Sequence, residues 1–176
     1  AIGTGSLYLD GSHHTTLASF SLPNVPVTLA GGSVGFTISF WFNPMGSQQV
    51  NACLISLLNS TGGGIVVSYN DTNSWLDISM NGVTYDIIPN MRPITSGTWN
   101  LFTLVGTCLG GAASNGASYT LYLNNYVVQT FFGSWPDVRS SYTNNKIGCA
   151  NSGIGYFTGN VDDFRMYTRA LSLQDI

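Results

Sequence analysis

Short runs of alternating or aliphatic residues, each ended by Gly, Asn, Ser or Pro, follow one another along the whole chain. A period of two with β-branched and aromatic residues predicts strands, while helical periodicity is nearly absent. The expected strands are residues 6–10, 15–20, 35–43, 52–58, 64–69, 75–80, 83–88, 98–107, 118–123, 126–132, 144–149 and 156–167. About a dozen short strands without a linker predict an all-β fold, a two-sheet antiparallel sandwich of jelly-roll type.

Turn signals separate these runs. Asn81-Gly82 lies between two alternating runs and predicts a hairpin, because both residues tolerate a positive φ. Asn124-Asn125 is a weaker version of the same signal. A last helical turn is expected to start at Ser172, whose side chain can cap it.

The low content of charged residues limits the kinds of partner that the chain is expected to bind. Charged residues make up 7% of the chain, against roughly 25% in an ordinary globular domain. With five basic residues and a net charge of −3, the chain has no basic patch that could follow a phosphate backbone, which argues against nucleic-acid binding. Such a Ser-, Thr- and Asn-rich surface favours a protein that works outside the cytosol, on a cell or virion surface.

Cys53, Cys108 and Cys149 are too few and too scattered for a disulfide framework. One bridge with a free thiol and three buried thiols both fit the sequence, and we favour the latter. No apolar run approaches the roughly 20 residues that span a bilayer, so membrane insertion is not expected.

Five segments in order, SLYLDGSHHTTL, GFTISFWFNP, SGTWNLFTLVGT, YTLYLNNYVVQT and FTGNVDDFRMYTRALSLQDI, extend over nearly the whole chain. Together they resemble the concanavalin A-like, laminin-G-type jelly roll in its pentraxin-related branch. Asn125 departs from the resemblance, since the family often has Gly at this hairpin tip. The resemblance implies one laminin-G-like domain over residues 1–176, which we expect to have been excised from a longer chain.

The closing run GNVDDFRMYTRALS holds four of the 13 charged residues. Alternation places Asp162 with Phe164 and Met166 on the core face, where a carboxylate is costly unless it is paired, hydrogen-bonded or metal-bound. In the related jelly rolls an Asp at this position binds a structural Ca²⁺ beside the opening segment, so the resemblance implies one Ca²⁺ held by Asp162 with Asp10 nearby. The alternative is that Asp162 accepts backbone N–H groups at a strand end.

Trp75 and Trp135 lie in polar turn contexts, NDTNSW and FFGSWPD. Exposed indoles stack on the C–H faces of sugars, so these two residues are the candidates for glycan contact; the alternative is that they cover sheet edges. Trp41 and Trp99 are expected in the core. Asp163, Arg165 and Arg169 are expected to form a solvated face with an ordinary ion pair.

Three functions remain open, because a fold alone does not choose between them. The first is a non-catalytic module that recognises carbohydrate or a surface protein. The second is a structural domain that packs against neighbouring domains of a larger assembly, such as a virion or fibre. The third is a glycan-cleaving enzyme, which we disfavour because all eight acidic residues are Asp and related glucanases use a Glu-containing strand.

Overall fold

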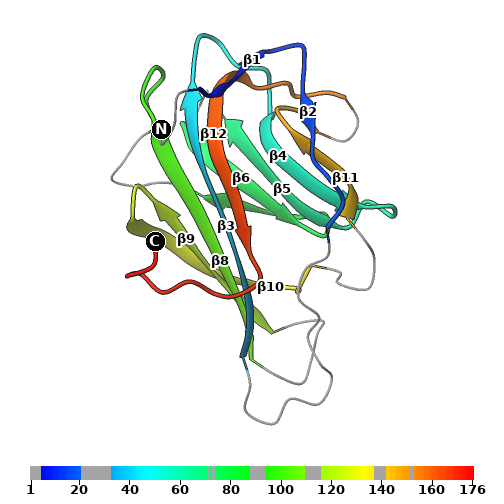
Figure 1. Ribbon diagram of the computed structural model, residues 1–176, viewed down its shortest axis with the longest axis vertical. Helices are drawn as coiled ribbons and strands as arrows, with labels where there is room; N and C mark the ends of the chain where they lie inside the picture. The colour runs from blue at the N-terminus through cyan, green and yellow to red at the C-terminus, as the bar shows by residue number, and fades with distance from the viewer. Residues whose placement is uncertain are drawn as a thin grey trace.

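The computed structural model describes residues 5–20, 33–70, 72, 74–87, 94–109, 116–136, 142–150 and 153–176. These residues form twelve strands in two six-stranded sheets (Figure 1). The strands are β1 (Leu7–Asp10), β2 (Thr15–Thr16), β3 (Ser33–Pro44), β4 (Ala52–Asn59), β5 (Gly64–Asn70), β6 (Trp75–Met80), β7 (Val83–Ile87), β8 (Asn100–Leu109), β9 (Ala117–Leu123), β10 (Tyr126–Gly133), β11 (Tyr142–Ile147) and β12 (Thr158–Tyr167). Sheet A has the order β1-β12-β3-β8-β9-β10, and sheet B has the order β2-β11-β4-β5-β6-β7. The predicted two-sheet antiparallel sandwich is confirmed.

Two local expectations differ from the structure. The expected strand at residues 15–20 is reduced to Thr15–Thr16, with one isolated bridge between Phe20 and Tyr142. The turn after Ser172 is not helical, and the described residues contain no helix. Consequently, no described helix has the length and apolarity needed to cross a membrane.

Both predicted hairpin tips adopt the left-handed backbone that a two-residue turn requires. Asn81 and Gly82 have φ of 49° and 83° between β6 and β7, and Asn124 and Asn125 have φ of 53° and 67° between β9 and β10. Positive φ at both central residues matches the right-handed twist of the flanking strands. Asn125 adopts this geometry where the related family often has Gly, because Asn tolerates the left-handed region.

The core lies between the sheets, and β3 contributes its central ridge. Phe36, Ile38, Phe40 and Phe42 are fully buried and alternate with residues of the opposite face. The ring of Phe40 stacks on that of Phe102 from β8, with ring centroids 4.7 Å apart. Alternation in β3 therefore assigns one face of sheet A to the core and leaves the other for the surface.

All three cysteines are free and buried, which confirms the expectation of three buried thiols. Burial raises the pKa of each thiol above its ordinary value. The cysteines are therefore uncharged packing residues at neutral pH.

Candidate functional site

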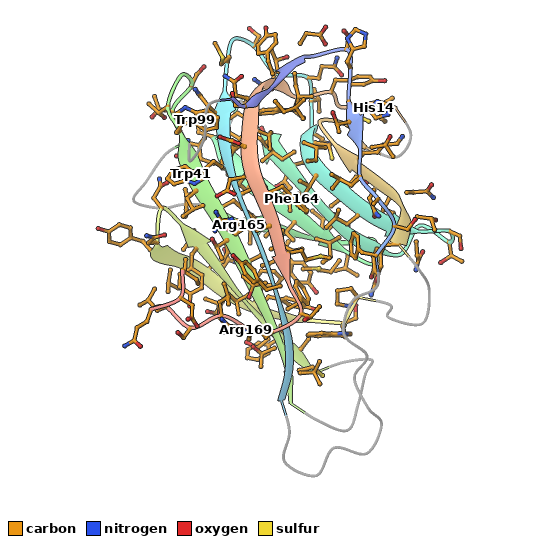
Figure 2. The ribbon with its side chains drawn as sticks, viewed as in Figure 1. His14, Trp41, Trp99, Phe164, Arg165 and Arg169 are labelled. Atoms are coloured by element: carbon orange, nitrogen blue, oxygen red, sulfur yellow. The ribbon has the colours of Figure 1, made fainter. Side chains whose placement is uncertain are left out.

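Trp41 lies on the outer face of sheet A, because it alternates along β3 with two core residues. Phe40 and Phe42 are fully buried between the sheets, whereas Trp41 is partly exposed on the opposite side. Trp99, just before β8, is partly exposed as well (Figure 2). The expectation that both tryptophans belong to the core is wrong, although the alternation in Phe-Trp-Phe was a signal for Trp41.

A β-bulge in β12 decides which of its side chains share this outer face. The register between β12 and β3 shifts between Asp162 and Arg165, and Asp163 adopts a left-handed conformation with φ of 52°. Asp162 pairs with the outward Trp41, while Val161, one position earlier, packs in the core. The bulge adds a residue that strict alternation does not count. Asp162 also lines a second hollow with Val161 and Phe164, which pack in or against the core, so its orientation toward the core stays a prediction.

Asp163 and Arg165 form an ion pair with two hydrogen bonds. Arg165 Nε donates to Oδ1 of Asp163, and Nη2 contacts Oδ2, each over 2.8 Å. Hydrogen bonds to Tyr167 and to Asp163 raise the pKa of Arg165 above its ordinary value. The expected solvated ion pair is present, and both of its residues line the same hollow as Trp41.

These residues surround a hollow of about 220 Å³, which we call the sheet A groove. Trp41, Asp163 and Arg165 line it, and Figure 2 shows Trp41 and Arg165 in the same region of the neighbouring strands β3 and β12. Its other hydroxyl and amide groups belong to Ser39, Thr103, Asn125 and Tyr167. An aromatic ring beside fixed donors and acceptors suits a ligand with both apolar and hydroxyl-bearing faces.

The C-terminal segment forms one wall of the groove, and Thr37 holds it in place. Thr37 Oγ1 donates to the carbonyl of Arg169 over 3.0 Å and accepts from the backbone N–H of Leu171 over 2.9 Å. Figure 1 shows this segment, in red, passing in front of β8 and β9. Leu171 and Asp175 line the groove as a result, and a buried hydroxyl on β3 fixes their position.

Trp75, one of the two predicted glycan-contacting residues, lies on the outer face of sheet B. It is partly exposed at the start of β6, opposite Asn70, and its indole N–H has no hydrogen-bond partner among the described residues. Two positions further, Asp77 faces Asp86 directly across β6 and β7. Burial and the neighbouring carboxyl of Asp86 raise the pKa of Asp77. The sequence analysis missed this pair, although the predicted Asn81-Gly82 turn already implies its register.

Trp135, the other predicted glycan-contacting residue, is buried in the core. Only 3% of its surface is exposed, and its ring meets that of Phe36 edge-on at 5.2 Å. The prediction that this indole is exposed is wrong, because the polar residues before it are followed by an inward turn of the chain. The structure thus does not bring Trp75 and Trp135 together, and only Trp75 is accessible.

Asp10 and Asp162, the two expected calcium ligands, lie at different heights along β1 and β12. Asp10 pairs with Thr158, four positions before Asp162, which corresponds to roughly 13 Å at about 3.3 Å per residue. Oδ1 of Asp10 accepts the backbone N–H groups of Ser12 and His13 over 2.9 and 3.0 Å. The two carboxylates therefore do not fit one shared ion.

A calcium site on Asp162 without Asp10 stays a prediction. Oδ2 of Asp162 is buried and has no partner among the described residues, while Oδ1 accepts the N–H of Asp163 over 2.8 Å. Calcium takes six to eight oxygen ligands, so one free carboxylate oxygen is only a part of such a site. Within the described ranges, no three His, Cys, Asp or Glu side chains are grouped as metal ligands.

Comparisons with known proteins agree with this architecture. The family model of the concanavalin A-like lectin/glucanases superfamily, Laminin_G_3, matches residues 14–176. No curated protein sequence matches the chain significantly.

Three similar solved structures show the same fold at low identity. The heptameric SAP-like pentraxin of Limulus polyphemus has a TM-score of 0.59 at 13% identity, covering 94% of this chain and 76% of that one. Domain 4 of AbnA, an extracellular arabinanase of Geobacillus stearothermophilus in complex with arabinotriose, has a TM-score of 0.54 at 18% identity, covering 98% and 80%. The CBM40 of a Ruminococcus gnavus IT-sialidase has a TM-score of 0.54 at 14% identity, covering 92% of each chain.

Proposed function

Because the chain belongs to the concanavalin A-like lectin/glucanases superfamily, we propose that it is a non-catalytic recognition module that binds carbohydrate in the sheet A groove. We place it in an extracellular or particle-surface protein whose partner is a free glycan or a glycosylated surface protein. Because a shallow groove buries little ligand, affinity per site is weak, and repetition of the module supplies avidity.

The observation that carries the proposal is Trp41 beside the Asp163–Arg165 pair. An indole offers a flat apolar surface for the C–H face of a sugar ring, and it costs little conformational entropy to hold. The carboxylate accepts from sugar hydroxyls and the guanidinium donates to them, and both are fixed by their mutual hydrogen bonds at 2.8 Å. Function is thus argued from these groups and not from the fold.

The similar structures support a binding role. The AbnA domain was solved with a bound arabinotriose, and the sialidase neighbour is a CBM40 module. At identities of 18% and 14%, these likenesses carry over the fold, and the use of the groove for sugar is our proposal.

The carboxylates of the chain favour recognition over hydrolysis. Glycosidases that use two carboxyl groups need one of them protonated, and the chain has no Glu. In the groove, the carboxylate of Asp163 is paired with the guanidinium of Arg165. Asp77, whose carboxyl has a raised pKa, lies beside Asp86 on sheet B, and neither residue lines the groove.

A structural role in a larger assembly is the second candidate, and the edge strand β10 favours it. Tyr126, Val127 and Phe132 are exposed on this strand, Phe132 by 73%. The strand carries no charged residue and no proline, the usual means of keeping a sheet edge from pairing. Contact of β10 with a neighbouring domain would cover these side chains.

A glycan array with the isolated domain tests the proposal, using Trp41→Ala with Trp75→Ala as the matched control. We expect binding that falls about fivefold in Trp41→Ala, since an aromatic contact contributes about 1 kcal/mol, and that persists in Trp75→Ala. Melting curves confirm that both variants are folded. Loss in Trp75→Ala alone would move the site to sheet B. A blank array, together with β10 buried in the parent protein, would favour assembly instead.

A further inference from the structure

We propose that the sheet A groove binds neutral glycans through two neighbouring hydroxyls and discriminates against glycans that carry a carboxylate or a sulfate. This inference rests on the proposed function and adds the chemical class of the ligand.

Arg165 is the one cation among the described residues that line the groove, and its positive charge is compensated by the carboxylate of Asp163. Its Nε and Nη2 atoms each lie 2.8 Å from an oxygen of Asp163, which occupies one bidentate edge of the guanidinium. An acidic sugar is left with the Nη1/Nη2 edge for a two-bond contact. The charge of this guanidinium is already compensated by Asp163, so the contact gains little from a negative charge on the sugar.

Asp163 is held in its ion pair with Arg165. Its backbone is fixed in the β12 bulge with φ of 52°, and its N–H donates to Oδ1 of Asp162 over 2.8 Å. The side chain of Asp163 is 21% exposed, against 47% for Arg165. Displacing it would leave a largely buried carboxylate without its cation, which is unfavourable.

The remaining charge of the groove also repels anions. Asp175 lines the groove with Asp163, while Arg169, which pairs with Asp175 over 3.2 Å, is not part of the lining. The lining thus holds two carboxylates and one guanidinium, in a chain of net charge −3. An anionic ligand therefore meets no net positive charge in the lining.

A neutral sugar uses the same pair without breaking it. One hydroxyl donates to a free lone pair of Asp163, and its neighbour accepts from an N–H of Arg165 that does not face Asp163. The adjacent ring of Trp41 covers the C–H face of the sugar, and Ser39 and Thr103 offer hydroxyls 3.1 Å apart in the groove lining. The groove thus matches a vicinal diol, and the Asp163–Arg165 ion pair stays intact.

The test compares the purified 176-residue chain with Asp163→Asn and Asp175→Asn on an array that pairs each neutral glycan with its sialylated and sulfated forms. Asn keeps the shape of Asp and tolerates the left-handed backbone at position 163. Both variants remove one negative charge from the groove. Only Asp163→Asn removes the carboxylate that contacts Nε and Nη2 of Arg165.

For the wild type, we expect neutral forms to bind about tenfold better than acidic ones, and we expect Asp163→Asn to reduce this preference by about tenfold. Asp175→Asn should change it by no more than about twofold, as screened charge alone predicts. Equal or stronger binding of acidic forms by the wild type overturns the inference and leaves the proposed function standing. A wild type that binds no glycan overturns the proposed function and, with it, this inference.

Discussion

Asp77 and Asp10 show how two aspartates of one chain come to have opposite surroundings. Asp77 is partly buried on β6, and burial together with Asp86 raises the pKa of its carboxyl. Asp10 is exposed in a turn, where hydrogen bonds from Ser12 and then from His13 hold the pKa of its carboxyl far below its ordinary value. In both cases the neighbouring residues decide the direction in which the pKa of the carboxyl is shifted.

The pH dependence of stability follows from these directions. The raised pKa of Asp77 gives stability that is fully present below the ordinary value of 3.8 and is lost as the pH rises through the folded-state value. Burial and the facing carboxyl of Asp86 both disfavour the ionised form of Asp77 in the folded state. We therefore expect Asp77→Asn to raise the free energy of unfolding by about 0.2–1 kcal/mol at pH 7 and to have little effect near pH 3.

Urea unfolding at the two pH values measures this effect, and Asp10→Asn provides a control of opposite sign. The lowered pKa of Asp10 gives stability that is present above its ordinary value and lost as the pH falls through the folded-state value. Asp10→Asn should consequently lower stability at pH 7. A destabilised Asp77→Asn at pH 7 would refute the proposed repulsion.

At the scale of elements, the hairpin of β4 and β5 depends on a glycine that allows two strands to approach. Gly64 has φ of 146°, and a Cβ there would lie 2.1 Å from the carbonyl oxygen of Leu57 and 2.8 Å from the ring of Tyr142. The loop before it is organised by Asn59, whose Oδ1 accepts from the N–H groups of Thr61 and Gly63. Asn59 and Gly64 together thus determine the turn between β4 and β5 and the start of β5.

Gly64→Ala should lower the free energy of unfolding by about 2–4 kcal/mol, because a strained φ and the displacement of a backbone carbonyl add to each other. Gly62→Ala is the matched control in the same turn: its φ is 83°, and a Cβ there would meet nothing within 4 Å. We expect it to cost about 1–2 kcal/mol, the penalty of the left-handed region alone. Equal losses in thermal or urea unfolding would show that close approach at Gly64 is unimportant.

At the scale of the whole molecule, sheet A brings together segments that are far apart in sequence. β12 pairs with β3, β3 pairs with β8, and the C-terminal segment packs over them through Thr37. Ser39, Thr103, Asp163 and Asp175 line one groove for this reason. Antiparallel pairing of distant strands, and not local structure, builds the site.

Calcium binding through Asp162 is tested by global unfolding, because an ion that binds only the native state stabilises it according to its concentration relative to Kd. The prediction requires a higher melting temperature in millimolar Ca²⁺ than in EDTA, and loss of this difference in Asp162→Ala. Asp10→Ala should keep the difference, since Asp10 lies four register positions away. Identical melting temperatures for the wild type in both solutions would rule the site out.

The sequence by itself determined the class of the fold and, apart from the expected strand at residues 15–20, the approximate position of the strands. Period-two alternation and turn residues reflect local backbone preferences, so β3, the Asn81-Gly82 tip and the Asn124-Asn125 tip were all predictable. The alternation of Phe40, Trp41 and Phe42 also indicates that the tryptophan faces outward, although a core position was expected for it.

Tertiary structure alone decided which side chains form the groove. The bulge at Asp163 adds one residue to β12 that strict alternation does not count, and Asp163 lines the groove together with Trp41. Trp135 is buried against Phe36 of β3, a tertiary contact that no local pattern indicates. Asp163 and Arg165 are close in sequence, but their position beside Trp41 arises from the pairing of β12 with β3 across more than a hundred residues of chain.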